Sequence, residues 1–274
     1  MKNRYLYGFI LLCFNALVIT SCIKEEWGVG NIDQSKDGGE GGWNKNKTIE
    51  VYYLTTLANK SVTNVTPVTD FFIDKGDACS LGIVDRTDVG VGATSGTNPV
   101  TQMAFATARF SSFALNKMTV SGSNTQIEGA TILFNHKINS EQSFKIADNC
   151  FLKYINIQAT TTTAEPIKIL VPFSTVRFDS KEQIDAAEST FNILAGTAYE
   201  GLVIGTVKTS LLVDLENVSK KIAGYTFTEV TKNAETEYSI FMIGKSSWVL
   251  REMTKTSVDG NLNAFCLSIE ASVE

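Results

Sequence analysis

Apolar residues in this chain occur in short runs, and the spacing within each run distinguishes strands from helices. Continuous runs, or apolar residues at every second position, are typical of β-strands, whereas apolar residues three or four positions apart are typical of helices. The pattern predicts helices at 69–75, 99–114, 180–194 and 211–222. It predicts strands at 49–54, 80–85, 113–120, 127–138, 144–147, 150–158, 202–205, 225–230, 237–243, 248–253 and 264–273.

The order of these elements predicts the fold class. Strands that follow one another closely form antiparallel sheets, and the intervening helices cover the outer faces of those sheets. We therefore expect an α+β fold with two face-to-face, mainly antiparallel β-sheets flanked by helices. The run 202–205, bounded by Gly201 and Gly205, is typical of a buried central strand. The polar residues beyond it, among them Thr206 and Lys208, lie where such strands carry ligands or catalytic groups.

The first residues predict export from the cell. Lys2 and Arg4 precede an apolar run at 6–18, which ends at Ile19-Thr20-Ser21-Cys22. The run is too short for a stable membrane span and is typical of a cleaved secretory signal. The small residues before Cys22 resemble the lipobox of bacterial lipoproteins, whose cysteine is acylated. This resemblance implies that a lipid on Cys22 anchors the mature protein to a membrane. The alternative is a plain signal peptide.

The sequence divides into three parts: a lipoprotein signal peptide at 1–21, a Gly-rich flexible tether at 22–46 and a folded domain at 47–274. The tether begins Ile23-Lys24-Glu25-Glu26, which is similar to the acidic export signals of surface lipoproteins in Bacteroidota-type bacteria. A solvated linker has the same composition. We expect a protein that is lipid-anchored in the outer membrane and exposed at the cell surface.

The net charge argues against one class of partner, and the cysteines indicate buried thiols. The formal net charge is −5, and removal of 1–21, which holds two cations and no anion, moves it to −7. An acidic protein repels phosphate backbones, so we expect no nucleic acid partner. Cys79, Cys150 and Cys266 lie in apolar runs and are expected to be buried free thiols. One disulfide plus one free thiol is the alternative, because an exported chain meets an oxidising compartment.

Several segments together suggest a known superfamily. Gly129-Ala130-Thr131-Ile132-Leu133 is similar to a family strand ending in Ala-Ile-Leu, 151–158 to a strand ending in Asn-Thr-His, and Tyr238-Ser239-Ile240-Phe241 to an Asp-Tyr-Ile-Phe segment. Asp179 to Leu194 corresponds to the helix before the family's Gly-Asp-x-Asn strand. Over about residues 48–273 the chain resembles the endonuclease/exonuclease/phosphatase superfamily, the fold of DNase I. The resemblance implies that fold.

The resemblance also implies metal-dependent phosphodiester hydrolysis, but the residues that carry it in the family are replaced here. The asparagine of the first strand falls near Thr55, and the glutamate falls at Asp85, one methylene shorter. The histidine falls at Gln158, which cannot act as a base. The Asp and Asn of Gly-Asp-x-Asn fall at Thr206 and Lys208, the later aspartate falls near Tyr238, and the closing Asp-His falls at 260–263, around Asn261. Lys208 would place a cation where a metal ligand belongs, so we expect neither metal nor cofactor.

Other catalytic chemistries find little support in the sequence. The only histidine, His136, follows a predicted strand and is expected at the surface, so a Ser-His-Asp or Cys-His site lacks a second candidate base. Acidic pairs such as Glu182 with Asp185 are typical of solvated helix surfaces. We therefore expect a degenerate family member, not an enzyme, that acts as a binding or interaction module for an unidentified surface ligand or protein.

Two alternatives of other classes remain open. One is an active phosphodiesterase that uses divergent site residues, which would depend on Asp85. The other is a glycan-binding or structural surface lipoprotein, for which Trp248 is the one tryptophan within 47–274 that could form a sugar platform.

Overall fold

The computed structural model describes residues 47–56, 60–62, 64–76, 79–90, 98–121, 124–136, 138–162, 168–195, 201–231, 237–245 and 247–271. All of them belong to one compact unit, Asn44–Glu274. The predicted signal peptide, Cys22 and the predicted tether lie outside the described residues.

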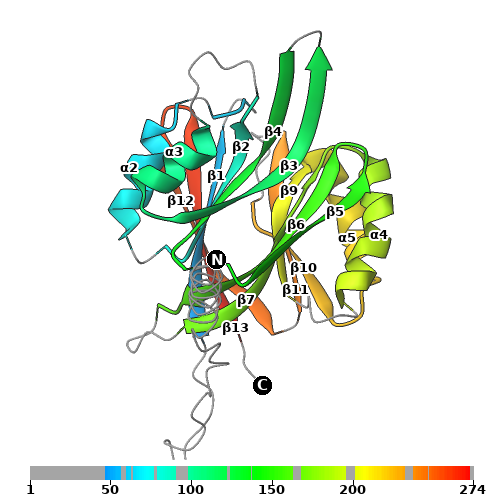
Figure 1. Ribbon diagram of the computed structural model, residues 1–274. Helices are drawn as coiled ribbons and strands as arrows, with labels where there is room; N and C mark the ends of the chain where they lie inside the picture. Colours follow the sequence, from blue (N-terminus) through cyan, green and yellow to red (C-terminus); the bar gives the residue numbers. More distant parts are fainter. Residues whose placement is uncertain are drawn as a thin grey trace, which may run out of the picture. The chain divides into compact units, whose positions relative to one another are not determined.

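In the part of the chain just given, six strands form the first sheet. Its order is β12 (Trp248–Asp259), β13 (Leu262–Ala271), β1 (Lys47–Thr56), β2 (Leu81–Asp88), β4 (Asn124–Phe134) and β3 (Phe110–Ser121). Only the β1–β2 pairing in this sheet is parallel. The long hairpin strands β3 and β4 extend beyond the rest of the sheet (Figure 1).

The second sheet has the order β10 (Tyr225–Glu229), β11 (Tyr238–Lys245), β9 (Leu202–Lys208), β7 (Lys168–Thr175), β6 (Cys150–Thr160) and β5 (Ser140–Ala147). The short strand β8 (Arg177–Phe178) continues from β7 and pairs with the last residues of β9. Strands β7 and β8 run parallel to β9, and the other pairings are antiparallel. The arrangement confirms the predicted α+β sandwich with β9 as a central, buried strand.

Alternating side chains on the strands fill three separate cores. Ile49, Val51 and Tyr53 on β1 face the second sheet and join the core between the sheets. Tyr52 and Leu54, one position out of phase, face helices α2 (Thr66–Lys75) and α3 (Pro99–Ala106). Helices α4 (Lys181–Ala195) and α5 (Leu212–Ser219) cover the outer face of the second sheet, and the short 3-10 helix η2 (Thr209–Leu211) leads into α5. The period of two therefore builds helix, sheet, sheet and helix layers.

The structure corrects one prediction about local structure and adds one strand that was not predicted. The helix predicted at 99–114 ends at Ala106, and β3 begins at Phe110. Ala108 adopts a left-handed backbone, with φ of 52°, which turns the chain out of the helix. Arg109 then donates hydrogen bonds to the carbonyl oxygens of Cys79 (2.7 Å) and Gly76 (2.5 Å), which fixes the direction of the new strand. In addition, the sequence pattern gave no prediction for β7.

The three cysteines of the described domain are free, as predicted; Cys79 and Cys150 are buried, whereas Cys266, also predicted to be buried, is half-buried. Burial raises the pKa of both thiols to about 12, so each is a neutral packing group near neutral pH. None of the described helices is both long and apolar enough to cross a membrane.

Candidate binding site

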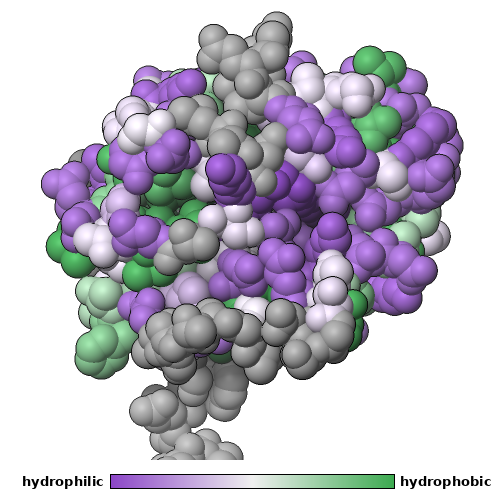
Figure 2. Space-filling model, turned by 90° about the horizontal axis from the view of Figure 1, so that it is seen from above, coloured by the Kyte–Doolittle hydropathy of each residue, from purple (hydrophilic) through white to green (hydrophobic). Residues whose placement is uncertain are grey.

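A polar pocket of about 350 Å³ opens between the two sheets, at the end of the sandwich where β8 and β9 finish. Figure 2 looks at the molecule from above and shows hydrophilic side chains gathered on this face. The pocket is lined by Arg86, Lys117, Thr119, Gln126, Glu128, Arg177, Asp179, Lys208 and Tyr238. We refer to these nine residues as the inter-sheet pocket. They come from both sheets, so the fold must form before the site exists.

Two β-bulges aim side chains from the first sheet into the pocket. Val84 pairs with Thr131 and Thr87 with Gly129, so Asp85 and Arg86 together oppose one residue of β4. In a regular strand, adjacent side chains point to opposite faces, whereas a bulge changes the direction of one of them. A second bulge lies in β3 where Leu115 and Lys117 pair with Gly129 and Glu128. The same short part of β4 therefore lies between two bulges.

Asp85 joins the two sheets at the base of the site. Its Oδ1 accepts hydrogen bonds from Thr206 Oγ1 on β9 (3.0 Å) and from Tyr53 on β1 (2.9 Å), and the residue is 4% exposed. Burial, together with the Asp85 charge, raises the pKa of Tyr53 well above its ordinary value, so this hydroxyl stays protonated and can donate. The structure thus brings together two residues that the sequence singled out, Asp85 and Thr206.

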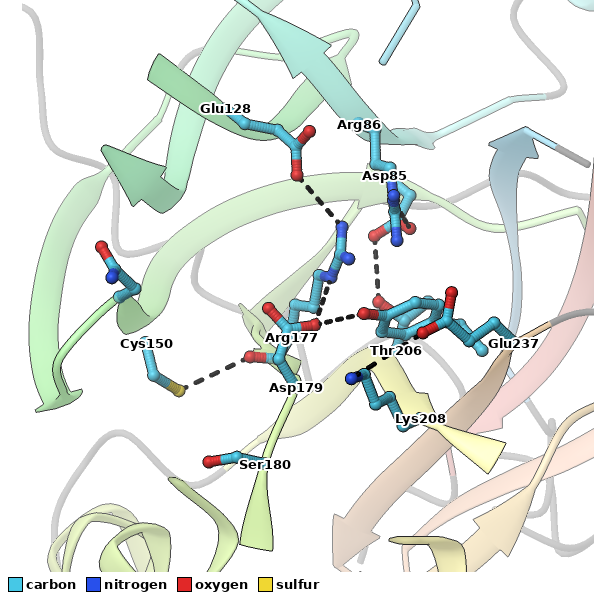
Figure 3. A network of polar contacts seen from close by, with 12 residues as sticks. Asp85, Arg86, Glu128, Cys150, Arg177, Asp179, Ser180, Thr206, Lys208 and Glu237 are labelled. Atoms are coloured by element: carbon cyan, nitrogen blue, oxygen red, sulfur yellow. Dashed lines mark hydrogen bonds and ion pairs between the residues drawn. The ribbon is translucent and has the colours of Figure 1, made fainter. Parts of the chain in front are cut away.

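Arg177 is the main charge inside the pocket, at 7% exposure. Its Nε donates to Asp179 Oδ1 (2.9 Å) and its Nη1 to Glu128 Oε1 (3.3 Å), as Figure 3 shows. Burial lowers the pKa of Arg177, but the carboxylates of Asp85 and Asp179 raise it by more, so the guanidinium stays charged. Arg177 belongs to the second sheet and Glu128 to the first, so this ion pair also links the sheets.

A capping arrangement at the start of α4 holds Asp179 in place. Ser180 Oγ accepts from the Gln183 backbone N–H (3.4 Å), and Gln183 Oε1 accepts from the Ser180 N–H (3.3 Å). This reciprocal pattern is a capping box and confirms the predicted helix start. Gln183 Oε1 also accepts from the Asp179 N–H (2.6 Å), so the residue before the helix is fixed beside Arg177.

The ring of Tyr238 lies against both arginines of the pocket. The guanidinium carbons of Arg177 and Arg86 are 4.2 Å and 4.8 Å from the ring centroid, which is cation–π geometry. The Tyr238 hydroxyl donates to Asp179 Oδ1 (2.6 Å). Burial and this hydrogen bond raise the pKa of Tyr238 to about 12, so the group is neutral near neutral pH.

Lys208, another residue predicted from the sequence, lies at the rim of the pocket. Its Nζ is 3.7 Å from Glu237 Oε1, and the side chain is 36% exposed. Asp85, Thr206, Lys208 and Tyr238 therefore meet at the pocket, whereas Thr55, Gln158 and Asn261 are not among the residues that line it.

Gln158 lies at the far end of the second sheet from the pocket. Strand β6 runs antiparallel to β7, which runs parallel to β9. β6 therefore begins near the pocket, where Cys150 Sγ donates to the Arg177 carbonyl oxygen (3.5 Å), and it ends away from it. The strand that delivers a side chain beside Thr206, just before α4, is β8, and that side chain is Arg177.

The remaining predicted positions serve local structure. Thr55 is half-buried in β1 and pairs with Asn263 of β13. Asn261 is exposed in the β12–β13 turn, where its backbone N–H donates to Asp259 Oδ1 (2.7 Å). His136 is half-buried rather than fully exposed, with its Nε2 3.0 Å from Thr160 Oγ1. Trp248 is half-buried and packs against the core between the sheets, so it does not present a free platform.

Four charged residues of the site were not predicted as site residues: Arg86, Lys117, Glu128 and Arg177. Arg177 could have been found from the sequence. It lies between the apolar Val176 and Phe178, so it is expected to be buried, and a buried cation needs a partner of opposite charge. Arg86 stands next to Asp85, but an alternating strand would send it to the opposite face. Nothing in the local sequence of Glu128 or Lys117 indicates that both bulged strands converge here.

The acidic residues of the site do not fit a divalent cation. Asp85 accepts from two hydroxyls, Asp179 accepts from Arg177 and Tyr238, and Glu128 accepts from Arg177 and from Ser61 Oγ (2.7 Å). Two guanidinium groups lie within the same pocket and would repel a metal ion. In the portion of the chain with assigned positions, no group of three or more His, Cys, Asp or Glu residues is placed to hold a metal.

A slightly larger hollow of about 370 Å³ lies elsewhere, between the start of α2 and the β12–β13 turn. Its lining includes Asp70 and Asp259, which are both exposed, and it holds no buried charge among the residues named for it. The inter-sheet pocket is therefore the better candidate for a site, because buried charged groups are arranged around it.

Comparison with known proteins relates the fold, rather than the sequence, to a family. No protein-family model and no curated protein matches the sequence. Among solved structures, an endonuclease/exonuclease/phosphatase family protein from Leptotrichia buccalis has a TM-score of 0.52 at 10% identity, covering 81% of this chain and 99% of that one. A family protein from Bacteroides thetaiotaomicron has a TM-score of 0.50 at 7% identity, covering 84% and 100%.

A third structure, D. rerio TDP2 humanized by 14 mutations, has a TM-score of 0.50 at 9% identity and covers 81% of this chain and 98% of that one. Such low identity relates folds and carries no residue roles. The chain therefore shares the sandwich fold of endonuclease/exonuclease/phosphatase family proteins.

Proposed function

We propose that this protein is a lipid-anchored, non-catalytic binding module that uses the fold of a phosphodiesterase. The observation that carries the proposal is the buried Arg177, which lies between Asp179 and Glu128 at the end of β8. The guanidinium of Arg177 forms an ion pair with each of these two carboxylates. The pocket keeps a defined shape and a set of polar groups, which a binding site needs.

The chemistry of the pocket supports binding better than hydrolysis. Activating a water near neutral pH requires a metal ion or a base with a suitable pKa. With a pKa of about 12, Tyr238 remains protonated and cannot accept the proton. Asp179 and Glu128 already accept hydrogen bonds from the guanidinium of Arg177, so these carboxylates are engaged in ion pairs. The pocket therefore offers hydrogen-bond donors that can bind a ligand, and it offers no evident general base that could activate a water for hydrolysis.

We expect no turnover of bis(p-nitrophenyl) phosphate by the purified full chain with Mg²⁺ or Mn²⁺, measured by release of p-nitrophenol. Titration calorimetry with either metal should give no saturable heat. The Asp85→Ala variant is the matched control, because it removes the carboxylate at the base of the site. Metal-dependent turnover that disappears in Asp85→Ala would instead establish the active hydrolase as the correct alternative.

The lipid anchor is tested separately. In cells grown with labelled palmitate, the wild-type chain should carry the label and Cys22→Ala should lose it, because acylation requires the thiol and amine of that residue. Cys13→Ala is the matched control, since Cys13 lies within the predicted signal and should not affect labelling. Equal labelling of wild type and Cys22→Ala would rule out an anchor at this residue.

A further inference from the structure

We propose that the inter-sheet pocket binds a small hydroxylated acid, that is, a polar molecule of sugar size carrying one singly charged carboxylate or sulfate group. This inference rests on the proposed binding function and names the class of ligand. It draws on the charge, the polarity and the size of the pocket.

The lining of the pocket carries more positive than negative charge. Arg86, Lys117, Arg177 and Lys208 are cationic, whereas Glu128 and Asp179 are anionic. Both of these carboxylates accept hydrogen bonds from Arg177. The surplus is therefore borne by the other three cations, which project from β2, β3 and β9.

One further buried carboxylate reduces this surplus from two charges to one, and a second carboxylate lies at the exposed rim. Asp85 lies beneath the lining, with its Oδ2 3.9 Å from Arg86 Nε. Glu237 lies 3.7 Å from Lys208 at the rim, and its side chain is 55% exposed, so solvent screens it. A ligand with a single negative charge therefore matches the pocket better than a polyanion.

The polar lining of the pocket indicates what the rest of the ligand, apart from its acid group, must be like. All nine lining residues are polar or aromatic, and Thr119 and Gln126 add a hydroxyl and an amide to the charged groups. Tyr238 supplies the one aromatic ring of the lining, and two guanidinium groups already lie against it. The body of the ligand must therefore form hydrogen bonds, as the hydroxyl groups of a sugar do.

The volume excludes most large ligands. About 350 Å³ is at the lower end of the range of roughly 300–1,000 Å³ that small-molecule sites occupy. Arg177 is rigid because it is buried and paired, whereas Lys117 and Lys208 are on exposed or half-exposed positions at the rim. A small acid would thus lie against the buried guanidinium of Arg177, and the ammonium groups of Lys117 and Lys208 at the rim could pair with its negative charge.

The test uses titration calorimetry on the full chain in detergent at low salt, with D-glucuronate and D-glucose as matched probes. The two sugars differ in a carboxylate against a hydroxymethyl group. We expect D-glucuronate to bind at least about tenfold more tightly than D-glucose, and added NaCl to weaken its binding. D-glucose 6-sulfate, which is also singly charged, distinguishes which acid group the pocket prefers, and the mostly dianionic D-glucose 6-phosphate should not bind more tightly than D-glucuronate.

The double variant Lys117→Gln/Lys208→Gln should weaken D-glucuronate binding about tenfold, because it removes both ammonium groups at the rim of the pocket. Lys220→Gln/Lys221→Gln is the matched control. It removes the same charge just after α5, far from the pocket lining, and should leave binding unchanged. A thermal melt shows that both variants fold.

The outcomes separate the two proposals. Equal affinity for D-glucuronate and D-glucose, no binding of any acid probe, or unchanged binding by Lys117→Gln/Lys208→Gln would overturn the assignment of an acid ligand and leave the non-catalytic function standing. Metal-dependent turnover of the phosphodiester would overturn the non-catalytic function itself.

Discussion

Replacing Arg177 by methionine should lower the free energy of unfolding by about 3 kcal/mol, the lower end of the range for buried ion pairs, because the buried guanidinium is lost while its two half-buried carboxylate partners remain. Asp179 and Glu128 would both lose a guanidinium donor, and Asp85 would lose a nearby positive charge. Urea denaturation followed by circular dichroism measures the change, and an unaltered slope of the unfolding free energy against urea would show that the folded state is otherwise intact.

Two further variants distinguish this cause from a general loss of packing. Lys220→Met breaks a surface pair with Glu216, in which the side chains are 64% and 42% exposed, and should produce no measurable change. Adding Asp179→Asn and Glu128→Gln to Arg177→Met removes the uncompensated charges and should restore part of the lost stability. If Arg177→Met unfolded at the same urea concentration as the wild type, the buried ion pairs would have no structural role.

The second large effect is expected at Gly205 in the centre of β9. A Cβ added there would lie 2.0 Å from the carbonyl oxygen of Val176, in the link between β7 and β8. The backbone would have to move, which would strain the hydrogen bond from the Thr206 N–H to the same oxygen (3.2 Å). Gly205→Ala should therefore destabilise the protein by about 2–3 kcal/mol, measured by the same urea titration.

Gly260 provides the matched control for that substitution. It lies in the β12–β13 turn, and nothing lies within 4 Å of the position that a Cβ would occupy. Gly260→Ala should unfold at the wild-type urea concentration or slightly above it. A loss of stability at Gly260 equal to that at Gly205 would show that the backbone contact with Val176 is not the cause.

The architecture could be predicted because apolar residues at every second position of a strand mark the side chains that are buried. On β1, alternate residues enter two different cores, and the same alternation is visible in the sequence. Strand β7 was missed for an identifiable reason. It contains Pro172, which normally argues against a central strand. The parallel pairing of β7 with β9 begins only at Phe173, so Pro172 precedes the ladder and its missing N–H is not needed on that side.

The candidate site was predictable only in part, because it depends on contacts between the sheets. The end of β9 could be selected from an apolar run that stops at polar residues, and Asp85 was selected from the family resemblance. The direction of β6 could not be predicted, because Gln158 follows an apolar run just as Thr206 does. Only the strand order and the antiparallel pairing show that the two runs end at opposite ends of the sheet. The pairing of Arg177 with Glu128 joins residues far apart in sequence, so no local pattern encodes it.

The bulge at Asp85 and Arg86 also bears on how this site could change during evolution. It places an acid and a base, encoded by neighbouring codons, against a single residue of β4. Deletion of either codon would restore a regular ladder in which one side chain, rather than two, occupies this position. A single in-frame deletion could therefore convert the floor of the pocket from a neutral pair to a lone carboxylate or a lone guanidinium. An alignment that forbids gaps inside strands would misplace such relatives by one residue from this point on.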